Sequence, residues 1–165
     1  MLFRSAFDAY PKGSALYQMA AGEQSARDAL AKFEEAVALD PGYAAAWSAR
    51  SRTLAFIANQ YLDGSARTAT FDQAIETANK ALKLAPDMAD AHSALGYATF
   101  FGRRNARAAR GPFERSAKLG QGEPDVLTRY ALYSARIGAF DIARTAILRA
   151  ARLDPLNPLD RKSVV

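Results

Sequence analysis

The chain has 165 residues, of which 50% are hydrophobic, and it carries a net charge of +5 and no cysteine. This length suits one domain with a sizeable core, while the lack of cysteine excludes disulfides and thiolate metal sites. The longest apolar stretch, residues 94–101, is far shorter than the roughly 20 residues of a membrane-spanning helix, and the first ten residues lack a signal-peptide core. We therefore expect a cytoplasmic domain without membrane insertion.

Helical spacing and helix-end signals predict eight helices in chain order. They cover residues 11–20, 25–39, 43–62, 70–84, 89–101, 105–119, 124–136 and 140–153. Asp87 and Asn105 are placed to cap the fifth and sixth helices, and Pro124 suits the first turn of the seventh. The sequence thus predicts an all-α protein in which each helix turns back against the one before it.

Every second helix carries the same pattern of small and aromatic residues. The equivalent positions are Ala29, Phe33, Ala36 and Pro41; Ala74, Ala78, Ala81 and Pro86; Ala109, Phe113, Ser116 and Gln121; and Ala143, Ile147, Ala150 and Pro155. In each set the first three residues share one helix face, and the last marks the turn that follows. This predicts one domain, residues 6–155, of four helix–turn–helix units at about 6–41, 42–86, 87–121 and 122–155, followed by a tail at 156–165.

These units resemble the tetratricopeptide repeat, which has a 34-residue pattern of W-x2-L-G-x2-Y, then A-x3-F, then P. Trp47 stands at the Trp position of the second unit, and Leu95 and Gly96 match Leu-Gly in the third. Gly13 matches the Gly of the first unit, and Ala131 replaces it in the fourth, so that paired helices can approach closely. The resemblance implies a right-handed α-solenoid whose first helices line a concave surface and whose role is protein–protein interaction.

The second unit carries an insertion. Pro41 lies 33 residues before Ala74, whereas Gln121 lies 22 before Ala143, which leaves 11 extra residues around 58–69. Eleven residues complete three helical turns, so longer helices can absorb them, and Thr70 with Gln73 reads as a capping box that restarts the partner helix.

A long second repeat of this kind is similar to that of the tetratricopeptide region appended to bacterial class III adenylate or guanylate cyclases and to some winged-helix transcription regulators. No cyclase or winged-helix motif is present in these residues. The resemblance therefore implies a regulatory module of a larger bacterial signalling protein, or a separate relative of such a module, with any cyclase activity in a domain outside this chain.

Patterns that carry chemistry are few. His92 is the single histidine and sits at a packing position, so we assign it a structural role. The sequence at residues 120–122 is G-x-G without a third glycine or a preceding strand, which is typical of a turn and not of a dinucleotide loop. We expect no enzymatic activity, no metal and no cofactor.

The family resemblance also predicts which side chains face the concave groove. They are Tyr10, Tyr17, Arg52, Phe56, Tyr97, Phe100, Phe101, Arg129 and Arg136. Aromatic rings edged by arginine suit a polypeptide segment with apolar anchors and a carboxylate, although Phe100 and Phe101 fit a purely packing role equally well. Family members that grip a C-terminal carboxylate use Lys and Asn, for which these arginines are only partial substitutes.

A different partner class is suggested by the basic second half of the chain, where residues 101–152 hold eleven Lys and Arg against four Asp and Glu. Arg103, Arg104, Arg107 and Arg110 form a run that resembles a phosphate-binding patch for nucleic acid or another anionic surface. The aromatic residues are not interleaved with this run, as a platform for single strands requires. We therefore expect weak, salt-sensitive binding to nucleic acid and prefer a protein partner.

Overall fold

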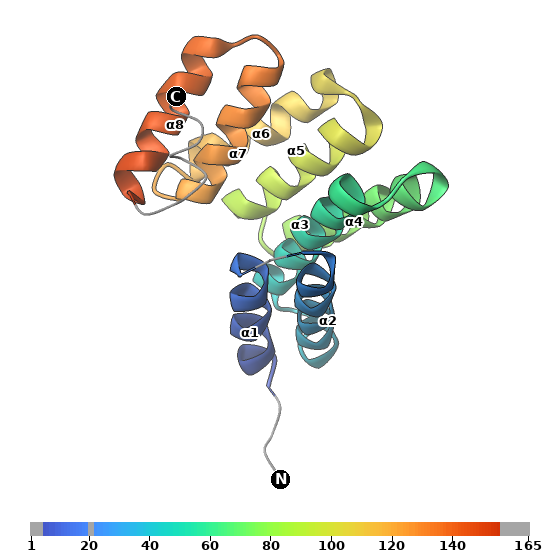
Figure 1. Cartoon of the computed structure of the whole chain (residues 1–165). Helices are drawn as coiled ribbons and strands as arrows, with labels where there is room; N and C mark the ends of the chain where they lie inside the picture. Colours follow the sequence, from blue (N-terminus) through green and yellow to red (C-terminus); the bar gives the residue numbers. More distant parts are fainter. Residues whose placement is uncertain (1–4, 20–21, 156–165) are drawn as a thin grey trace.

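The computed structural model describes residues 5–19 and 22–155, which form eight α-helices stacked in a curved array (Figure 1). The helices are α1 (Ala6–Gln18), α2 (Glu23–Leu39), α3 (Ala44–Tyr61), α4 (Gly64–Leu84), α5 (Ala89–Arg103), α6 (Ala106–Leu119), α7 (Pro124–Arg136) and α8 (Phe140–Leu153). Consecutive helices pack as pairs, and α1, α3, α5 and α7 also contact one another in succession. The prediction of an all-α helical-repeat solenoid is confirmed.

Two of the pairs close around a phenylalanine that packs on a glycine. A Cβ atom added at Gly13 would lie 2.8 Å from Phe33 Cε1, and one added at Gly96 would lie 2.9 Å from Phe113. Both phenylalanines are fully buried. The predicted close approach of paired helices at these glycines is therefore present, and a larger residue at either position would push the pair apart.

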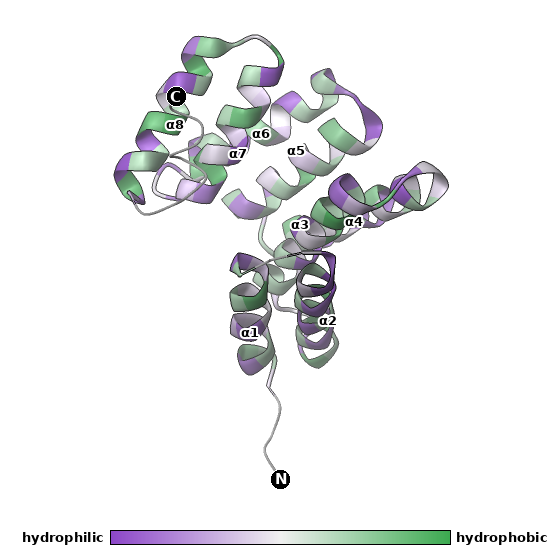
Figure 2. Cartoon of the chain, in the orientation of Figure 1, coloured by the Kyte–Doolittle hydropathy of each residue, from purple (hydrophilic) through white to green (hydrophobic). Residues whose placement is uncertain are grey.

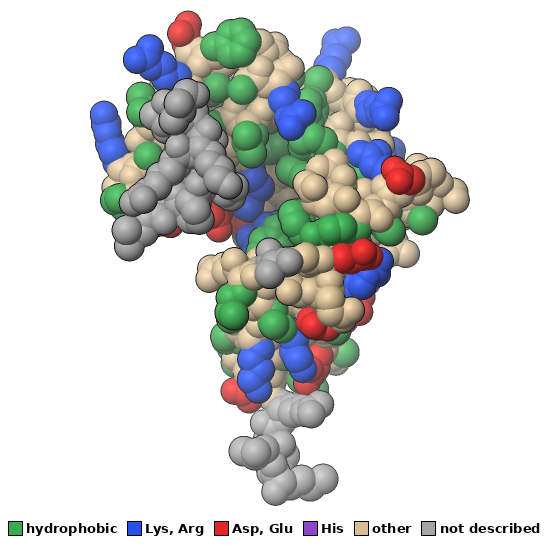
Figure 3. Space-filling model, viewed as in Figure 1, with side chains coloured by type: hydrophobic (Ala, Val, Ile, Leu, Met, Phe, Trp, Pro, Cys, Tyr) green, Lys and Arg blue, Asp and Glu red, His purple; other side chains and the backbone are tan. Residues whose placement is uncertain are grey.

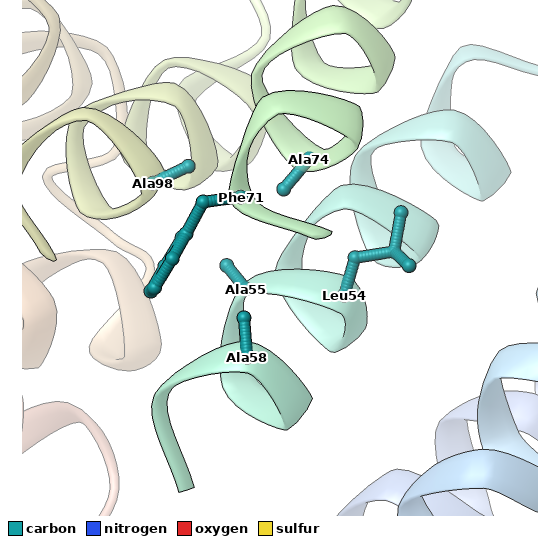
Figure 4. Packing of buried hydrophobic residues seen from close by; sticks show 6 residues of the cluster. All are labelled: Leu54, Ala55, Ala58, Phe71, Ala74 and Ala98. Atoms are coloured by element: carbon teal, nitrogen blue, oxygen red, sulfur yellow. The ribbon is translucent and has the colours of Figure 1, made fainter. Parts of the chain in front are cut away.

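The pair α3–α4 has the longest helices of the array, with 18 and 21 residues, and these two helices pack on each other without a glycine contact of this kind. Ser51 stands where the first and third pairs have glycine, and its hydroxyl donates a hydrogen bond of 2.7 Å to the carbonyl of Ala74. Phe71 packs with Leu54, alanines of α3 and Ala98 of α5 (Figure 4). This ring therefore ties the second pair to the third.

The predicted start of the fourth helix at residue 70 is wrong. Helix α4 begins six residues earlier, at Gly64, whose φ of +55° favours glycine, and it continues unbroken to Leu84. The Thr70 hydroxyl donates to the carbonyl of Ala66, 2.9 Å away, as it does inside a continuous helix. The residues around the predicted insertion thus lengthen α4 instead of forming a separate cap.

Other helix ends differ where a local bond overrides the sequence signal. Helix α1 starts at Ala6 and not at Pro11, because Ser5 and Asp8 form a reciprocal capping box. The structure describes α1 to Gln18, and Ala20, where the predicted helix ended, lies outside the described residues.

At the fifth helix Asp87 is not the cap, since its carboxylate pairs with Arg115 at 2.5 Å. Asn105 does cap α6, accepting a hydrogen bond of 2.9 Å from the Ala108 amide, and Pro124 is the first residue of α7 as predicted.

The last helix is the least enclosed. Ala29, Ala74 and Ala109 are completely buried, whereas the equivalent Ala143 of α8 is only partly buried. Helix α8 packs mainly on α7, its Arg149 Nε also donates to the carbonyl of Gln121 at 2.8 Å, and hydrophobic bands remain visible along it in Figure 2. The exposed hydrophobic side chains of α8 are Phe140, Ile142, Leu148 and Leu153. None of the helices that the structure describes is long and apolar enough to cross a membrane.

Candidate functional site

An ion network joins three of the inner helices. Asp90, in the first turn of α5, accepts hydrogen bonds at Oδ1 from Arg52 Nη1 of α3 at 2.9 Å and from Arg129 Nη2 of α7 at 2.5 Å. The three side chains are only 16%, 22% and 14% exposed for Arg52, Asp90 and Arg129. One carboxylate thus neutralises charge from two neighbouring units, and we call these three residues the central ion network.

Two buried serines complete the central ion network. Ser48 Oγ donates to the second oxygen of Asp90 at 2.6 Å, and Arg129 Nε donates to Ser93 Oγ at 2.7 Å. The Arg52 guanidinium lies 4.9 Å from the centre of the Tyr17 ring, while its buried Nε has no hydrogen-bond partner. Both carboxylate oxygens are therefore used within the protein.

The network stays ionised because its charges face each other. Burial alone would raise the pKa of the Asp90 carboxyl, but Arg52 and Arg129 together with the Ser48 hydrogen bond hold it well below its usual value. Burial likewise favours the neutral form of Arg52, and the Asp90 charge outweighs it and raises the pKa of the guanidinium. Burial raises the pKa of the Tyr17 phenol. At neutral pH the site holds two cations, one anion and a neutral phenol.

A pocket of about 580 Å³ opens beside the network, and we call it the inner pocket. It is lined by Tyr10, Ala45, Arg52, Met88, Asp90, Gly122, Glu123, Pro124, Asp125 and Asp154. Its wall therefore comes from all four pairs, and its rim is acidic. Burial and the Asp90 charge raise the pKa of Glu123. Figure 3 shows basic and acidic side chains together in the recess between the α1–α2 pair below and the rest of the molecule above.

Five of the nine predicted groove residues gather around this recess. Tyr10 lines the inner pocket and packs on Tyr43 with ring centres 5.1 Å apart. Tyr17 contacts Phe56 edge to face at 5.9 Å as well as Arg52. The remaining member, Arg129, belongs to the central ion network. These residues hold neighbouring first helices together, so their packing role is as evident as their position in the groove.

The other four predicted residues form a second, neighbouring group in the C-terminal halves of α5 and α7. Tyr97 and Phe101 have ring centres 4.4 Å apart, Phe100 meets Phe101 edge to face at 5.0 Å, and the Arg136 guanidinium lies 5.1 Å from the Phe101 ring. Burial raises the pKa of Tyr97 to about 12, and Asn59 donates to its hydroxyl at 3.2 Å. The structure therefore divides the predicted groove residues into two groups.

Two participants were missed by the sequence analysis. Asp90 is not among the predicted groove residues, although the single acidic residue of a helix between two units that carry inward arginines was an available signal. Arg67, in the first turn of α4, donates to the carbonyl of Phe101 at 3.2 Å and so joins the second group. Because the start of α4 was misplaced, nothing in the sequence brought Arg67 to this end of α5.

The run of four arginines is partly neutralised. Arg103 pairs with Asp72 at 3.2 Å, and Arg110 pairs with Glu114 at 2.7 Å. Arg104 and Arg107 are exposed and have no carboxylate partner in the part of the chain that the structure describes. The run therefore presents less free positive charge than its sequence suggests.

His92 has the structural role that the sequence predicted. Its Nε2 lies 2.8 Å from the carbonyl of Pro86, six residues earlier, just as Trp47 Nε1 donates to the carbonyl of Pro41 at 2.9 Å. Both side chains thus fasten an inter-unit turn to the helix that follows. Among residues 5–19 and 22–155 no cluster of His, Cys, Asp and Glu could hold a metal ion.

Comparisons with known proteins agree with this geometry. No family model and no curated protein matches the chain. The solved structure of TTC0263, a thermophilic TPR protein of Thermus thermophilus, is similar with a TM-score of 0.67 at 16% identity and covers 96% of both chains. The chain has the tetratricopeptide repeat fold.

The protein MamA has the same fold. Residues 41 to the end of MamA from Desulfovibrio magneticus RS-1 give a TM-score of 0.57 at 16% identity, covering 93% of this chain and 78% of that one. Another MamA crystal structure gives 0.53 at 20% identity, with coverage of 80% and 70%. At these identities the likeness establishes the architecture alone.

Proposed function

We propose that this chain is a non-catalytic interaction module that binds a polypeptide segment along the groove formed by α1, α3, α5 and α7. The observation that carries this proposal is the inner pocket, because about 580 Å³ of open space is lined by residues of all four helix pairs. A single elongated ligand that lies across successive inner helices would contact several units at once. Tetratricopeptide solenoids offer extended concave surfaces of this kind.

The central ion network favours a preformed groove. Arg52, Asp90 and Arg129 fix α3, α5 and α7 to one another through bonds that are mostly shielded from water. A surface whose curvature is set in this way loses little conformational entropy when a ligand binds. The resemblance in the second unit further supports a regulatory role within a larger bacterial signalling protein in the cytoplasm.

The proposal is tested with random 12-residue peptides displayed on phage and selected on the whole chain. Enriched peptides are synthesised and titrated into ¹⁵N-labelled protein. We expect shifted amide resonances in α1, α3, α5 and α7. Asp125→Lys, which places a longer side chain of opposite charge at the rim of the inner pocket, should weaken binding tenfold or more.

The matched control is Asp28→Lys, which makes the same charge change on the exposed side of α2 and should alter the affinity less than twofold. Shifts confined to α2, α4, α6 and α8, or equal losses in both variants, would overturn the groove assignment. A selection that enriches no peptide would count against the proposal as well.

A second candidate, binding to nucleic acid or another anionic surface, is favoured by Arg104 and Arg107, the members of the basic run outside the Arg103 and Arg110 salt bridges. We expect a labelled 20-nucleotide DNA to bind weakly at about 20 mM salt and to be released near 150 mM, because phosphate contacts lose affinity steeply with salt. Submicromolar binding at the higher salt that is lost in an Arg104→Gln, Arg107→Gln variant would make this the main function.

A further inference from the structure

Five residues line an open, smaller pocket of about 260 Å³ that shares no lining residue with the inner pocket. Its lining consists of Arg67, Phe100, Phe101, Arg104 and Arg136, and we call it the arginine pocket. Three helices meet there, because Arg67 is in the first turn of α4, Arg104 caps α5 and Arg136 ends α7. Figure 1 shows why α4 reaches this place, since the α3–α4 hairpin projects beyond the neighbouring pairs.

The charge of the arginine pocket is not compensated. Its lining residues include three arginines and no acidic residue. Across the ranges 5–19 and 22–155, none of the three guanidinium groups is paired with a carboxylate, unlike Arg52 and Arg129, which share Asp90. A pocket lined by three arginines and no acidic residue attracts an anion at long range.

Two of the cations are held in place before any ligand arrives. Arg67 donates to the carbonyl of Phe101 at 3.2 Å, and its guanidinium lies 4.7 Å from the Phe71 ring. The Arg136 guanidinium lies 5.1 Å from the Phe101 ring. Contacts of this kind orient the planar fork that binds both oxygens of a carboxylate.

The third cation occupies an unusual backbone position. Arg104 is the C-cap of α5 with φ +48°, and it is the single non-glycine residue with positive φ among those the structure describes. Glycine is the usual residue at such a left-handed helix end, and any other costs roughly 1 kcal/mol. A large charged residue at this strained position is explained if its side chain serves the pocket that it lines.

The apolar part of the lining narrows the ligand class. Phe100 contacts both Phe101 and Tyr133 edge to face, so the two phenylalanines of the pocket form one fixed aromatic wall. A wall of this kind suits one apolar side chain beside the anionic group. It offers no row of separate rings on which successive bases of a nucleic acid would stack.

We propose that the arginine pocket binds a glutamate or aspartate carboxylate of a partner polypeptide together with a neighbouring apolar side chain. This inference rests on the proposed function, since it supplies the chemistry of the segment that lies in the groove. The carboxylate bridges guanidinium groups of α4, α5 and α7, and the apolar neighbour covers the edges of Phe100 and Phe101.

The test uses a blocked five-residue peptide, acetyl-Gly-Leu-Glu-Leu-Gly-amide, titrated into the ¹⁵N-labelled whole chain. We expect the side-chain Nε–Hε resonances of Arg67, Arg104 and Arg136 to shift. The same peptide with Gln in place of Glu should bind at least tenfold more weakly. Equal binding of the two peptides would overturn the proposal, as would shifts limited to arginines elsewhere in the chain.

Variants locate the binding. The double variant Arg104→Gln, Arg136→Gln should lose at least tenfold in affinity, whereas Arg152→Gln, an exposed arginine of α8, should change it less than twofold. Arg136→Glu, which lowers the charge of the lining from three positive to one positive, should lose more affinity for the Glu peptide than Arg136→Gln does, which a merely structural role of Arg136 would not produce. Thermal melts within about 2 °C of wild type would show that the variants remain folded, and losses of equal size in all variants would contradict the site.

Two further titrations distinguish a peptide carboxylate from other anions that could bind the arginine pocket. Inorganic phosphate and a nine-nucleotide oligo-dT are titrated under the same conditions, and either one binding tenfold more tightly than the Glu peptide would overturn the peptide assignment. A failure of the arginine-pocket proposal is distinguishable from a failure of the proposed peptide groove. Phage-selected peptides that respond to Asp125→Lys but not to the arginine variants would leave the groove intact and remove the arginine pocket. Peptides that respond to the arginine variants but not to Asp125→Lys would support the arginine pocket and overturn the groove assignment at the inner pocket.

Discussion

The central ion network and the arginine pocket show two uses of arginine within 165 residues. In the network Asp90 satisfies Arg52 and Arg129 in a setting that is largely closed to water, so these charges bind helices to one another. In the arginine pocket three arginines line one pocket that has no acidic residue in its lining. The difference indicates that the first group serves the fold and that the second is available to a ligand.

The largest expected effect comes from removing the shared anion. Asp90→Ala leaves two mostly buried guanidinium groups uncompensated, and we expect a loss of about 3 kcal/mol in unfolding free energy, measured by urea denaturation. Asp87→Ala removes a carboxylate from an exposed pair with Arg115 and should cost less than about 1 kcal/mol. Similar losses in the two variants would show that the network is no more than a surface interaction.

Lowering the pH should remove the contribution of the central ion network to folding stability. The folded state lowers the pKa of the Asp90 carboxyl, so its stabilising contribution is complete above the unfolded pKa of about 3.9 and is lost as the pH falls through the lower folded value. Urea midpoints should therefore drop between about pH 4 and pH 2. Asp90→Asn should flatten this dependence, and an unchanged slope in that variant would assign the acid sensitivity to other carboxylates.

At Arg104 we expect one substitution to preserve or raise stability while it weakens ligand binding. Arg104→Gly relieves the left-handed strain at the end of α5, so the unfolding free energy should stay the same or rise by up to about 1 kcal/mol, although glycine also loosens the unfolded chain. Binding of the Glu peptide should weaken in the same variant. A loss of stability greater than about 1 kcal/mol would mean that the Arg104 side chain is part of the packing.

The smallest effect is expected at Arg136. Its side chain is exposed and has no ion pair with a carboxylate of the described residues, and its guanidinium lies by the Phe101 ring, so Arg136→Gln should change the unfolding free energy by about 0.5 kcal/mol or less. Arg129→Gln, on the same helix, should cost clearly more because it breaks the bond to Asp90. Equal costs at the two positions would erase the distinction between the two arginine groups.

The sequence predicted the fold well because spacings of three and four residues report directly on buried helix faces. The grid through Phe33 and Phe113 identified the paired helices and their glycine contacts. Helix starts were harder, since Pro11 resembles a start signal, yet it lies inside α1, where the Ser5 cap sets the beginning. At Thr70 a plausible capping pattern is likewise part of a longer helix.

The site was predicted only in part. Resemblance to the family named Arg52 and Arg129, but their common partner Asp90 follows from how three units stack, which no local pattern records. The same holds for Arg67, which meets Phe101 across 34 residues of sequence. Contacts between units depend on the length and the curvature of the array, and those are properties of the assembled helices.

The length of α4 has a consequence for how such a surface can diversify. At about 1.5 Å per residue, its 21 residues make it about 10 Å longer than α6, which has 14. The additional turns leave the buried alanine face in register and change only how far the hairpin extends past its neighbours. Helix length therefore determines whether a side chain such as Arg67 reaches the far end of the neighbouring unit. A binding feature can thus be gained or lost by adding or deleting whole turns while the core sequence stays the same.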